Sequence, residues 1–196
     1  MRIVDIIDEV ADGKHQHRDL ESMRGVAVHR VGHELGDDAV EICRRFTDDP
    51  EVARYTGGQV PYTLIIGGSD GPSTNDGCVW QCLPLDEIGH HARRWSVPYL
   101  GLACIGDFRH APPTDAQYHA LVDVLAELCA GFRWDPYQRI KGHGEIKDAH
   151  DGSKAPDQAN ACPGHLLNTN ALRYDVERMM LELARLRLSE SGLVWV

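Results

Sequence analysis

Two predicted strands of this chain end in a histidine, and a cysteine follows in a later loop. His29 closes the apolar segment 26–28, His143 closes the short strand 139–142, and Cys162 lies in the loop-like segment 160–164. Zinc binds imidazole nitrogen and thiolate sulfur, and a catalytic zinc site has three protein ligands and keeps its fourth position for water. These three residues are therefore candidate zinc ligands, although 11 histidines and 6 cysteines allow other triples to be drawn.

The elements that must position these side chains alternate between strand and helix. Apolar runs bounded by turn residues predict strands over 25–29, 61–67, 77–83, 99–106 and 139–143. Helical spacing of apolar residues predicts helices over 4–11, 38–46, 114–131 and 170–190. Segment 99–106 is almost continuously apolar, which is typical of a central strand with both faces covered. We therefore predict an α/β fold, with a central mixed sheet of about five strands flanked by helices.

Length and composition indicate one globular domain. The 196 residues are 42% hydrophobic and 26% charged, which excludes a disordered or fibrous chain. No repeat or long linker divides the sequence, so residues 1–196 are expected to form a single domain. Within it, we expect residues 1–23 to form an N-terminal helix and loop, and residues 170–190 to form a C-terminal helix.

Charge and hydropathy restrict the partners. A formal net charge of −10 without a basic patch argues against nucleic-acid binding. The N-terminus carries no signal-peptide pattern and no apolar run is long enough to cross a bilayer, so we expect cytoplasmic synthesis and no membrane insertion. In that compartment the cysteines are expected to be reduced. We also expect a monomer.

An ordered series of motifs carries a resemblance to a known family. The motifs are Val26-Ala27-Val28-His29, Pro61-Tyr62-Thr63, Gly89-His90-His91-Ala92, the strand 99–106 followed by Asp107-Phe108, Gly142-His143-Gly144-Glu145, and Ala161-Cys162-Pro163-Gly164. In this order the chain, from about residue 24 to residue 176, resembles the zinc-dependent N-acetylmuramoyl-L-alanine amidases, which include phage endolysins and peptidoglycan recognition proteins. The resemblance implies an amidase-like catalytic domain.

The resemblance implies roles for individual residues. His29, His143 and Cys162 would bind one Zn²⁺, which lowers the pKa of its water and polarises the carbonyl of the amide between N-acetylmuramic acid and L-alanine. Tyr62 would orient that water or stabilise the oxyanion. His91 falls where the family has a histidine that lines the substrate groove. An ordinary core or solvated histidine is the alternative interpretation of His91.

Three further residues are candidates for substrate binding from their chemistry. Trp95 can stack on a sugar ring, and Arg93 and Arg94 can bind the carboxylates of a stem peptide. A solvated loop is the alternative interpretation of this basic pair.

The chain departs from the family where phage amidases carry a lysine, two residues before the last metal ligand. Asn160 stands at this position and brings no charge, so Lys154 from the same long loop is a second candidate for oxyanion stabilisation. Glu145, two residues after His143, is a candidate carboxylate for orienting a ligand.

The predicted function is zinc-dependent hydrolysis of the bond between N-acetylmuramic acid and L-alanine in peptidoglycan, by a phage or prophage endolysin that acts on the cell wall. The alternatives are a module that binds peptidoglycan or muropeptides without cutting them, and a cytoplasmic amidase that recycles muropeptides. A zinc hydrolase acting on another amide also stays open, because substrate choice depends on the loops.

Overall fold

The computed structural model describes residues 3–10, 15–32, 38–54, 56–68, 75–148 and 162–190, with residues 147, 148 and 188–190 as backbone alone. These residues form one mixed six-stranded sheet in the order β1-β4-β3-β5-β2-β6. Only β3 and β4 pair antiparallel among the neighbouring strands. The strands are β1 Ile3–Asp5, β2 Gly25–Val31, β3 Leu64–Ile66, β4 Val79–Gln81, β5 Tyr99–Ile105 and β6 Ile140–Gly142. The predicted α/β class and mixed sheet are confirmed, with one strand more than expected.

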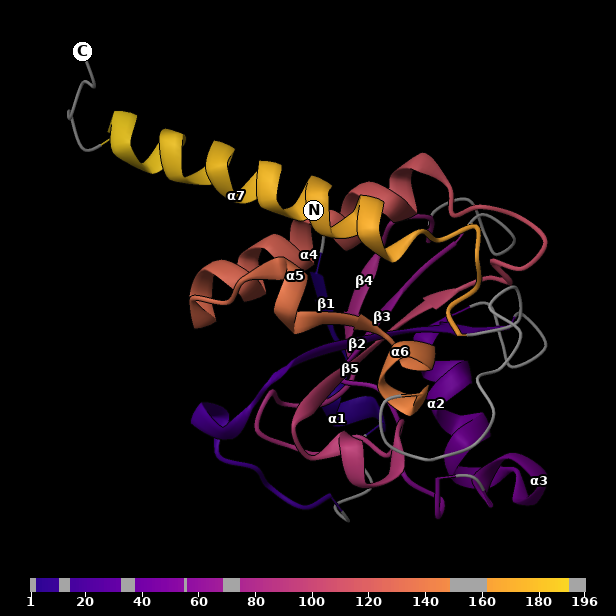
Figure 1. The fold of residues 1–196 in the computed structure, drawn as a ribbon. Helices are drawn as coiled ribbons and strands as arrows, with labels where there is room; N and C mark the ends of the chain where they lie inside the picture. The colour runs from indigo at the N-terminus through magenta and orange to yellow at the C-terminus, as the bar shows by residue number, and fades with distance from the viewer. Residues whose placement is uncertain are drawn as a thin grey trace.

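Helices lie on both sides of this sheet (Figure 1). The longest are α4 and α7 on one side, and α1 and α2 lie on the other. The helices are α1 Ile7–Val10, α2 Ala39–Asp48, α3 Pro50–Ala53, α4 Asp115–Phe132, α5 Pro136–Arg139, α6 His143–Asp148 and α7 Thr169–Glu190. Among the described residues, the 3-10 helix η1 Leu20–Ser22 precedes β2, and η3 Arg93–Ser96 precedes β5.

The additional strand lies at the N-terminus. The predicted helix over 4–11 is wrong at its start, because residues 3–5 form β1 and the helix α1 begins at Ile7. Val4 lies opposite Trp80 in a parallel pair with β4. Branched side chains at Ile3 and Val4 suit a strand, and the edge of β4 supplies the hydrogen-bonding partner that local spacing does not reveal.

Side-chain caps begin the two amphipathic helices where the sequence predicts them. The Asp38 carboxylate accepts a hydrogen bond from the amide of Glu41 at the start of α2, and the Thr114 hydroxyl accepts one from the amide of Gln117 at the start of α4. The Gln117 side chain donates to the carbonyl oxygens of Ile66 and Ile105 at 3.2 and 2.9 Å, and so joins α4 to β3 and β5.

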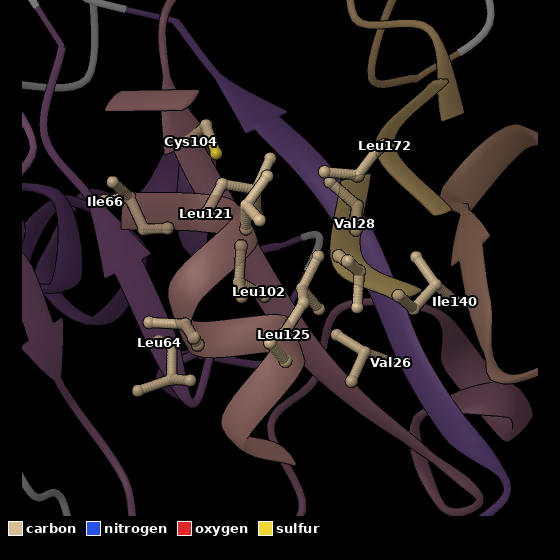
Figure 2. Close-up of a cluster of buried hydrophobic side chains, with 14 of the residues drawn as sticks. Val26, Val28, Leu64, Ile66, Leu102, Cys104, Leu121, Leu125, Ile140 and Leu172 are labelled. Atoms are coloured by element: carbon tan, nitrogen blue, oxygen red, sulfur yellow. The ribbon is translucent and has the colours of Figure 1, made fainter. Parts of the chain in front are cut away.

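Alternation along the central strands separates two apolar cores. Val26 and Val28 of β2 and Leu102 of β5 share one core with Leu121 and Leu125 of α4 (Figure 2). Residues of opposite parity, including Ala103, face the second core with α2. His29 pairs in register with Ala103, so its imidazole lies on the α2 side of the sheet, beside a small residue that leaves room for it.

Candidate metal site

Parallel pairing of β2 with β6 brings the first two candidate ligands together. Val28 is the register partner of Gly142, so His29, which lies within β2, and His143, which directly follows β6, occupy the next positions along the two strands. The two imidazole rings lie 4.4 Å apart, centre to centre. His143 is the first residue of α6, and His29 is only 2% exposed. The predicted strand end at His29 is wrong, because β2 continues to Val31, but the register still places the two side chains side by side.

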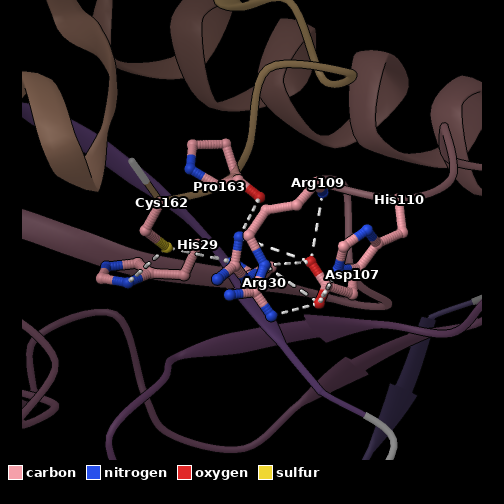
Figure 3. A network of polar contacts seen from close by, with 7 residues as sticks. All are labelled: His29, Arg30, Asp107, Arg109, His110, Cys162 and Pro163. Atoms are coloured by element: carbon pink, nitrogen blue, oxygen red, sulfur yellow. Dashed lines mark hydrogen bonds and ion pairs between the residues drawn. The ribbon is translucent and has the colours of Figure 1, made fainter. Parts of the chain in front are cut away.

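Cys162 reaches the same place from a distant segment. Potential ligand atoms of His29, His143 and Cys162 all lie within 4.8 Å of one another, the only such group of three or more among the described parts of the chain. The Cys162 sulfur lies 3.9 Å from Nδ1 of His29 and accepts a hydrogen bond from the backbone amide of Arg30 at 3.4 Å (Figure 3). The amide of Gly144 donates to the Cys162 carbonyl at 2.8 Å, which ties this loop to α6.

A polar network supports the loop from the next position on β2. The Arg30 guanidinium lies 3.5 Å from both the Pro163 carbonyl and the Asp107 carboxylate. Asp107 also pairs with Arg109, and these guanidinium groups lower the pKa of the Asp107 carboxyl (Figure 3). Arg30 therefore holds the segment that carries Cys162 against the end of β5.

The electrostatics of this triad suit a divalent cation. Burial and the neighbouring histidines lower the pKa of His29 well below its usual value, so its imidazole is neutral and keeps a lone pair. Burial raises the pKa of the Cys162 thiol, because a thiolate there loses its hydration. A bound cation stabilises the thiolate, and two imidazoles with one thiolate are ligands that zinc prefers. The donor set therefore fits Zn²⁺.

Tyr62 lies beside the triad. Its ring is 5.2 Å from the ring of His29 and 5.9 Å from that of Phe46 on α2. Burial, together with the nearby Cys162, raises the pKa of the Tyr62 phenol, so the hydroxyl stays protonated at neutral pH. The structure thus places a buried, protonated hydroxyl group near the triad, and its catalytic role stays a prediction.

His91 occupies a different place from the one expected for a residue that lines a groove. Its Nδ1 lies 2.9 Å from Nε2 of His29, and its Nε2 lies 3.0 Å from the carbonyl oxygen of Tyr99. Burial lowers the pKa of His91 to about 3. Both ring nitrogens therefore have protein partners, which leaves neither free to bind a substrate.

Trp95, Arg93 and Arg94 follow His91 in η3. Arg93 and Arg94 are exposed, and the Arg94 guanidinium lies 5.4 Å from the centre of the Trp95 ring. An exposed cation over an aromatic face can present both groups to a ligand. Their substrate-binding role stays a prediction.

Glu145 connects two elements behind the site. Its carboxylate accepts a hydrogen bond from the Gly142 amide at 2.6 Å and forms an ion pair with Arg173 of α7 at 2.5 Å. Arg173 is only 6% exposed and also donates to the Ile140 carbonyl at 2.9 Å. These contacts favour an anchoring role for Glu145, between α7 and the strand that precedes His143, over the orientation of a metal ligand.

Glu145→Gln is expected to lower the free energy of unfolding by about 1–2 kcal/mol and to leave zinc content unchanged. The buried Arg173 would lose its charged partner, but the Glu145 side chain is 41% exposed, which moderates the effect. Urea unfolding and metal analysis would measure both quantities. Glu182→Gln, on the exposed face of α7, is the matched control and is expected to change stability by less than about 0.5 kcal/mol. Lost zinc with unchanged stability would instead support the ligand-orienting role.

Lys154 and Asn160, the two candidates for oxyanion stabilisation, lie outside the described residues.

Two residues that support the site are not predicted from the sequence. Arg18 lies in the predicted N-terminal helix and loop, yet it is 6% exposed and its guanidinium donates to the carbonyl oxygen of Tyr99 at 3.0 Å. Gly101 leaves the space that the His91 ring fills, since a Cβ at this position would lie 2.6 Å from Cδ2 of His91. A charged residue in a polar segment and a glycine in an apolar strand carry no sequence signal for these contacts.

Among the described helices, none combines the length and apolar character needed to cross a membrane.

Comparison with known proteins gives one family. Residues 19–165 match the N-acetylmuramoyl-L-alanine amidase family. The chain is also 28% identical over 110 residues to a peptidoglycan-recognition protein of Drosophila melanogaster, and to the same protein of Drosophila simulans. Each alignment covers 56% of this chain and 50% of the relative, so the match spans half the length of these curated proteins.

Solved structures share the fold at low identity. The endolysin of the Thermus scotoductus bacteriophage Ph2119 superposes with a TM-score of 0.62 at 21% identity, covering 89% of this chain and 99% of the endolysin. Drosophila peptidoglycan recognition protein LB superposes with a TM-score of 0.60 at 21% identity, covering 85% of this chain and 89% of the recognition protein. The complex of peptidoglycan recognition proteins LCa and LCx with tracheal cytotoxin gives a TM-score of 0.59 at 20% identity, over 85% of this chain and 92% of the matched chain.

Proposed function

We propose that this chain, which belongs to the N-acetylmuramoyl-L-alanine amidase family, is a zinc-dependent hydrolase that cleaves the amide between N-acetylmuramic acid and L-alanine in peptidoglycan. The observation that carries the proposal is the convergence of His29, His143 and Cys162, whose potential ligand atoms lie within 4.8 Å of one another. These are the residues that the resemblance assigned to the metal. The agreement of this geometry with the family match supports hydrolysis over binding alone.

In the proposed reaction, the metal and the side chains of the protein have different roles. Bound by these three ligands, zinc supplies a Lewis acid that activates water and polarises the amide carbonyl. Tyr62 keeps its phenolic proton because its pKa is raised, so its hydroxyl can donate a hydrogen bond to the oxygen on which negative charge develops. Trp95, Arg93 and Arg94 are proposed to bind the sugar and the stem-peptide carboxylates.

Binding of muropeptides without cleavage is the second candidate function. It draws support from the curated relatives, which are peptidoglycan-recognition proteins, and from the related LCa and LCx structure, which holds tracheal cytotoxin. The presence of Cys162 in the triad favours cleavage. Its thiolate is a ligand for a metal ion, and the metal is needed for hydrolysis. An endolysin role is proposed from the fold shared with the phage Ph2119 protein, and muropeptide recycling is the other setting for the same reaction.

Zinc removal tests the proposed reaction. The purified protein is expected to contain one equivalent of zinc and to release new L-alanine amino termini from purified peptidoglycan. A chelator should abolish this release and added zinc should restore it, because the metal activates the attacking water. Metal analysis and amino-terminus labelling would follow both steps. Bound zinc without release would favour the binding function, and absence of zinc would contradict the metal site.

A further inference from the structure

His29, His91 and the carbonyl oxygen of Tyr99 are connected by hydrogen bonds. The Tyr99 carbonyl, at the end of this chain, determines which nitrogen donates in each bond. The carbonyl oxygen of Tyr99 lies 3.0 Å from Nε2 of His91. A carbonyl oxygen only accepts hydrogen bonds, so Nε2 of His91 must carry the proton. A neutral imidazole with its proton on Nε2 has a lone pair on Nδ1, which is the nitrogen that lies 2.9 Å from Nε2 of His29.

The same reasoning continues to His29. Because Nδ1 of His91 is an acceptor, Nε2 of His29 must donate and therefore carries its proton. Nδ1 of His29 is then unprotonated, and this nitrogen lies 3.9 Å from the Cys162 sulfur. The opposite tautomers would place two lone pairs against each other at the Tyr99 carbonyl. The lone pair of His29 is thus directed to the side where the other two candidate ligands lie.

Arg18 holds the acceptor at the end of this chain. Its guanidinium donates to the carbonyl oxygens of Ser96, Val97 and Tyr99, at 3.0, 3.2 and 3.0 Å, and also to that of Glu87. The Tyr99 carbonyl therefore accepts hydrogen bonds from both Arg18 and His91. Burial lowers the pKa of Arg18 to about 10, so the group is still a cation at neutral pH. Arg18 lies just before residues 19–165, over which the family matches.

Packing fixes the position of the His91 ring. The ring lies against Gly101 of β5, where a Cβ would be only 2.6 Å from Cδ2 of His91. Any side chain at residue 101 would therefore push the imidazole away from His29 or Tyr99. Hydrogen bonds at both nitrogens and contact with the sheet together leave the ring one orientation.

We propose that His91 is a positioning residue that, with Arg18 and the Tyr99 carbonyl, holds His29 in the tautomer whose Nδ1 is free to bind the metal. The inference rests on the zinc site of the proposed function. It differs from the expected groove role, because His91 acts through His29 and binds no substrate. Buried partners of this kind typically contribute about 10- to 100-fold to metal affinity.

The first test reads the tautomers directly in the metal-free protein. Two-bond nitrogen–proton NMR correlations are expected to show the proton on Nε2 in both His29 and His91, with signals assigned from His29→Ala and His91→Ala spectra. A proton on Nδ1 of His29 in the wild type would overturn the proposal, whether or not the protein binds zinc. Absence of zinc binding with the expected tautomers would instead contradict the proposed function alone.

The second test measures zinc affinity by competition with a chromophoric chelator. His91→Ala is expected to weaken binding by about 10- to 100-fold. His91→Gln should recover most of the affinity, because an amide can accept from His29 and donate to Tyr99 at once. His119→Ala, which changes a histidine of α4, is the matched control and should bind zinc like the wild type. Equal affinities for His91→Ala and His119→Ala would overturn the proposal.

A third test replaces Arg18 by lysine. Lysine keeps the positive charge, but it lacks the planar guanidinium group that donates to several carbonyl oxygens at once. Zinc affinity is expected to fall, by less than in His91→Ala. An unchanged zinc affinity would contradict the proposed role of Arg18 in holding the Tyr99 carbonyl. If His91→Ala does not fold, the wild-type tautomers still decide the proposal.

Discussion

Cys162→Ser is expected to abolish both zinc binding and peptidoglycan hydrolysis while the protein stays folded. A serine hydroxyl does not ionise at neutral pH, so the site would lose its anionic ligand and keep two neutral imidazoles. The fold should survive, because the Cys162 sulfur accepts a single long hydrogen bond from Arg30 and the loop is also held through its backbone to Gly144. Metal analysis and release of amino termini would measure the two losses.

A thermal shift with added zinc separates loss of the site from loss of the fold. A ligand that binds only the native state raises the melting temperature, so zinc should stabilise the wild type and leave Cys162→Ser unchanged. Cys129→Ser is the matched control, since Cys129 is fully buried in α4 away from the triad. It should lower stability and retain one zinc. Stoichiometric zinc in Cys162→Ser would show that Cys162 is not a ligand.

Tyr62→Phe is expected to retain one zinc and to reduce kcat by roughly 100- to 1,000-fold, the usual effect of removing one hydrogen bond to a developing oxyanion. Phenylalanine preserves the ring contacts with His29 and Phe46, so the packing around the triad should not change. Only the protonated hydroxyl is lost. Steady-state kinetics on a soluble muropeptide would measure the effect, with KM changing less than kcat.

Tyr118→Phe is the matched control for the loss of a hydroxyl. The Tyr118 hydroxyl donates to Asp175 at 2.8 Å between α4 and α7, on the other side of the sheet. Its removal should lower stability by about 1 kcal/mol and leave kcat unchanged. If Tyr62→Phe were as active as the wild type, Tyr62 would be a structural aromatic residue and another group would stabilise the oxyanion.

Much of the fold could be predicted because its signals are local. The helices α2 and α4 begin where the apolar spacing predicts them, with Asp38 and Thr114 as caps, and the apolar run at 99–106 is the central strand β5. β1 was missed because three residues form a strand only when a neighbouring edge accepts them, and that edge belongs to β4, far along the chain. The α/β class followed from the order of elements, but the sixth strand did not.

For the site, the sequence by itself determined the residue types, and the motif order singled out His29, His143, Cys162 and Tyr62. Only the tertiary structure decided what surrounds them. Strand register brings His29 beside His143, and burial makes His91 a partner of His29 with both nitrogens occupied. Burial likewise gives Arg18 the Tyr99 carbonyl as a partner, and gives the buried Arg173 the carboxylate of Glu145. The physical reason is that caps and periodicity depend on neighbours within a few residues, whereas the partner of a buried polar group is chosen by packing between segments far apart in the chain.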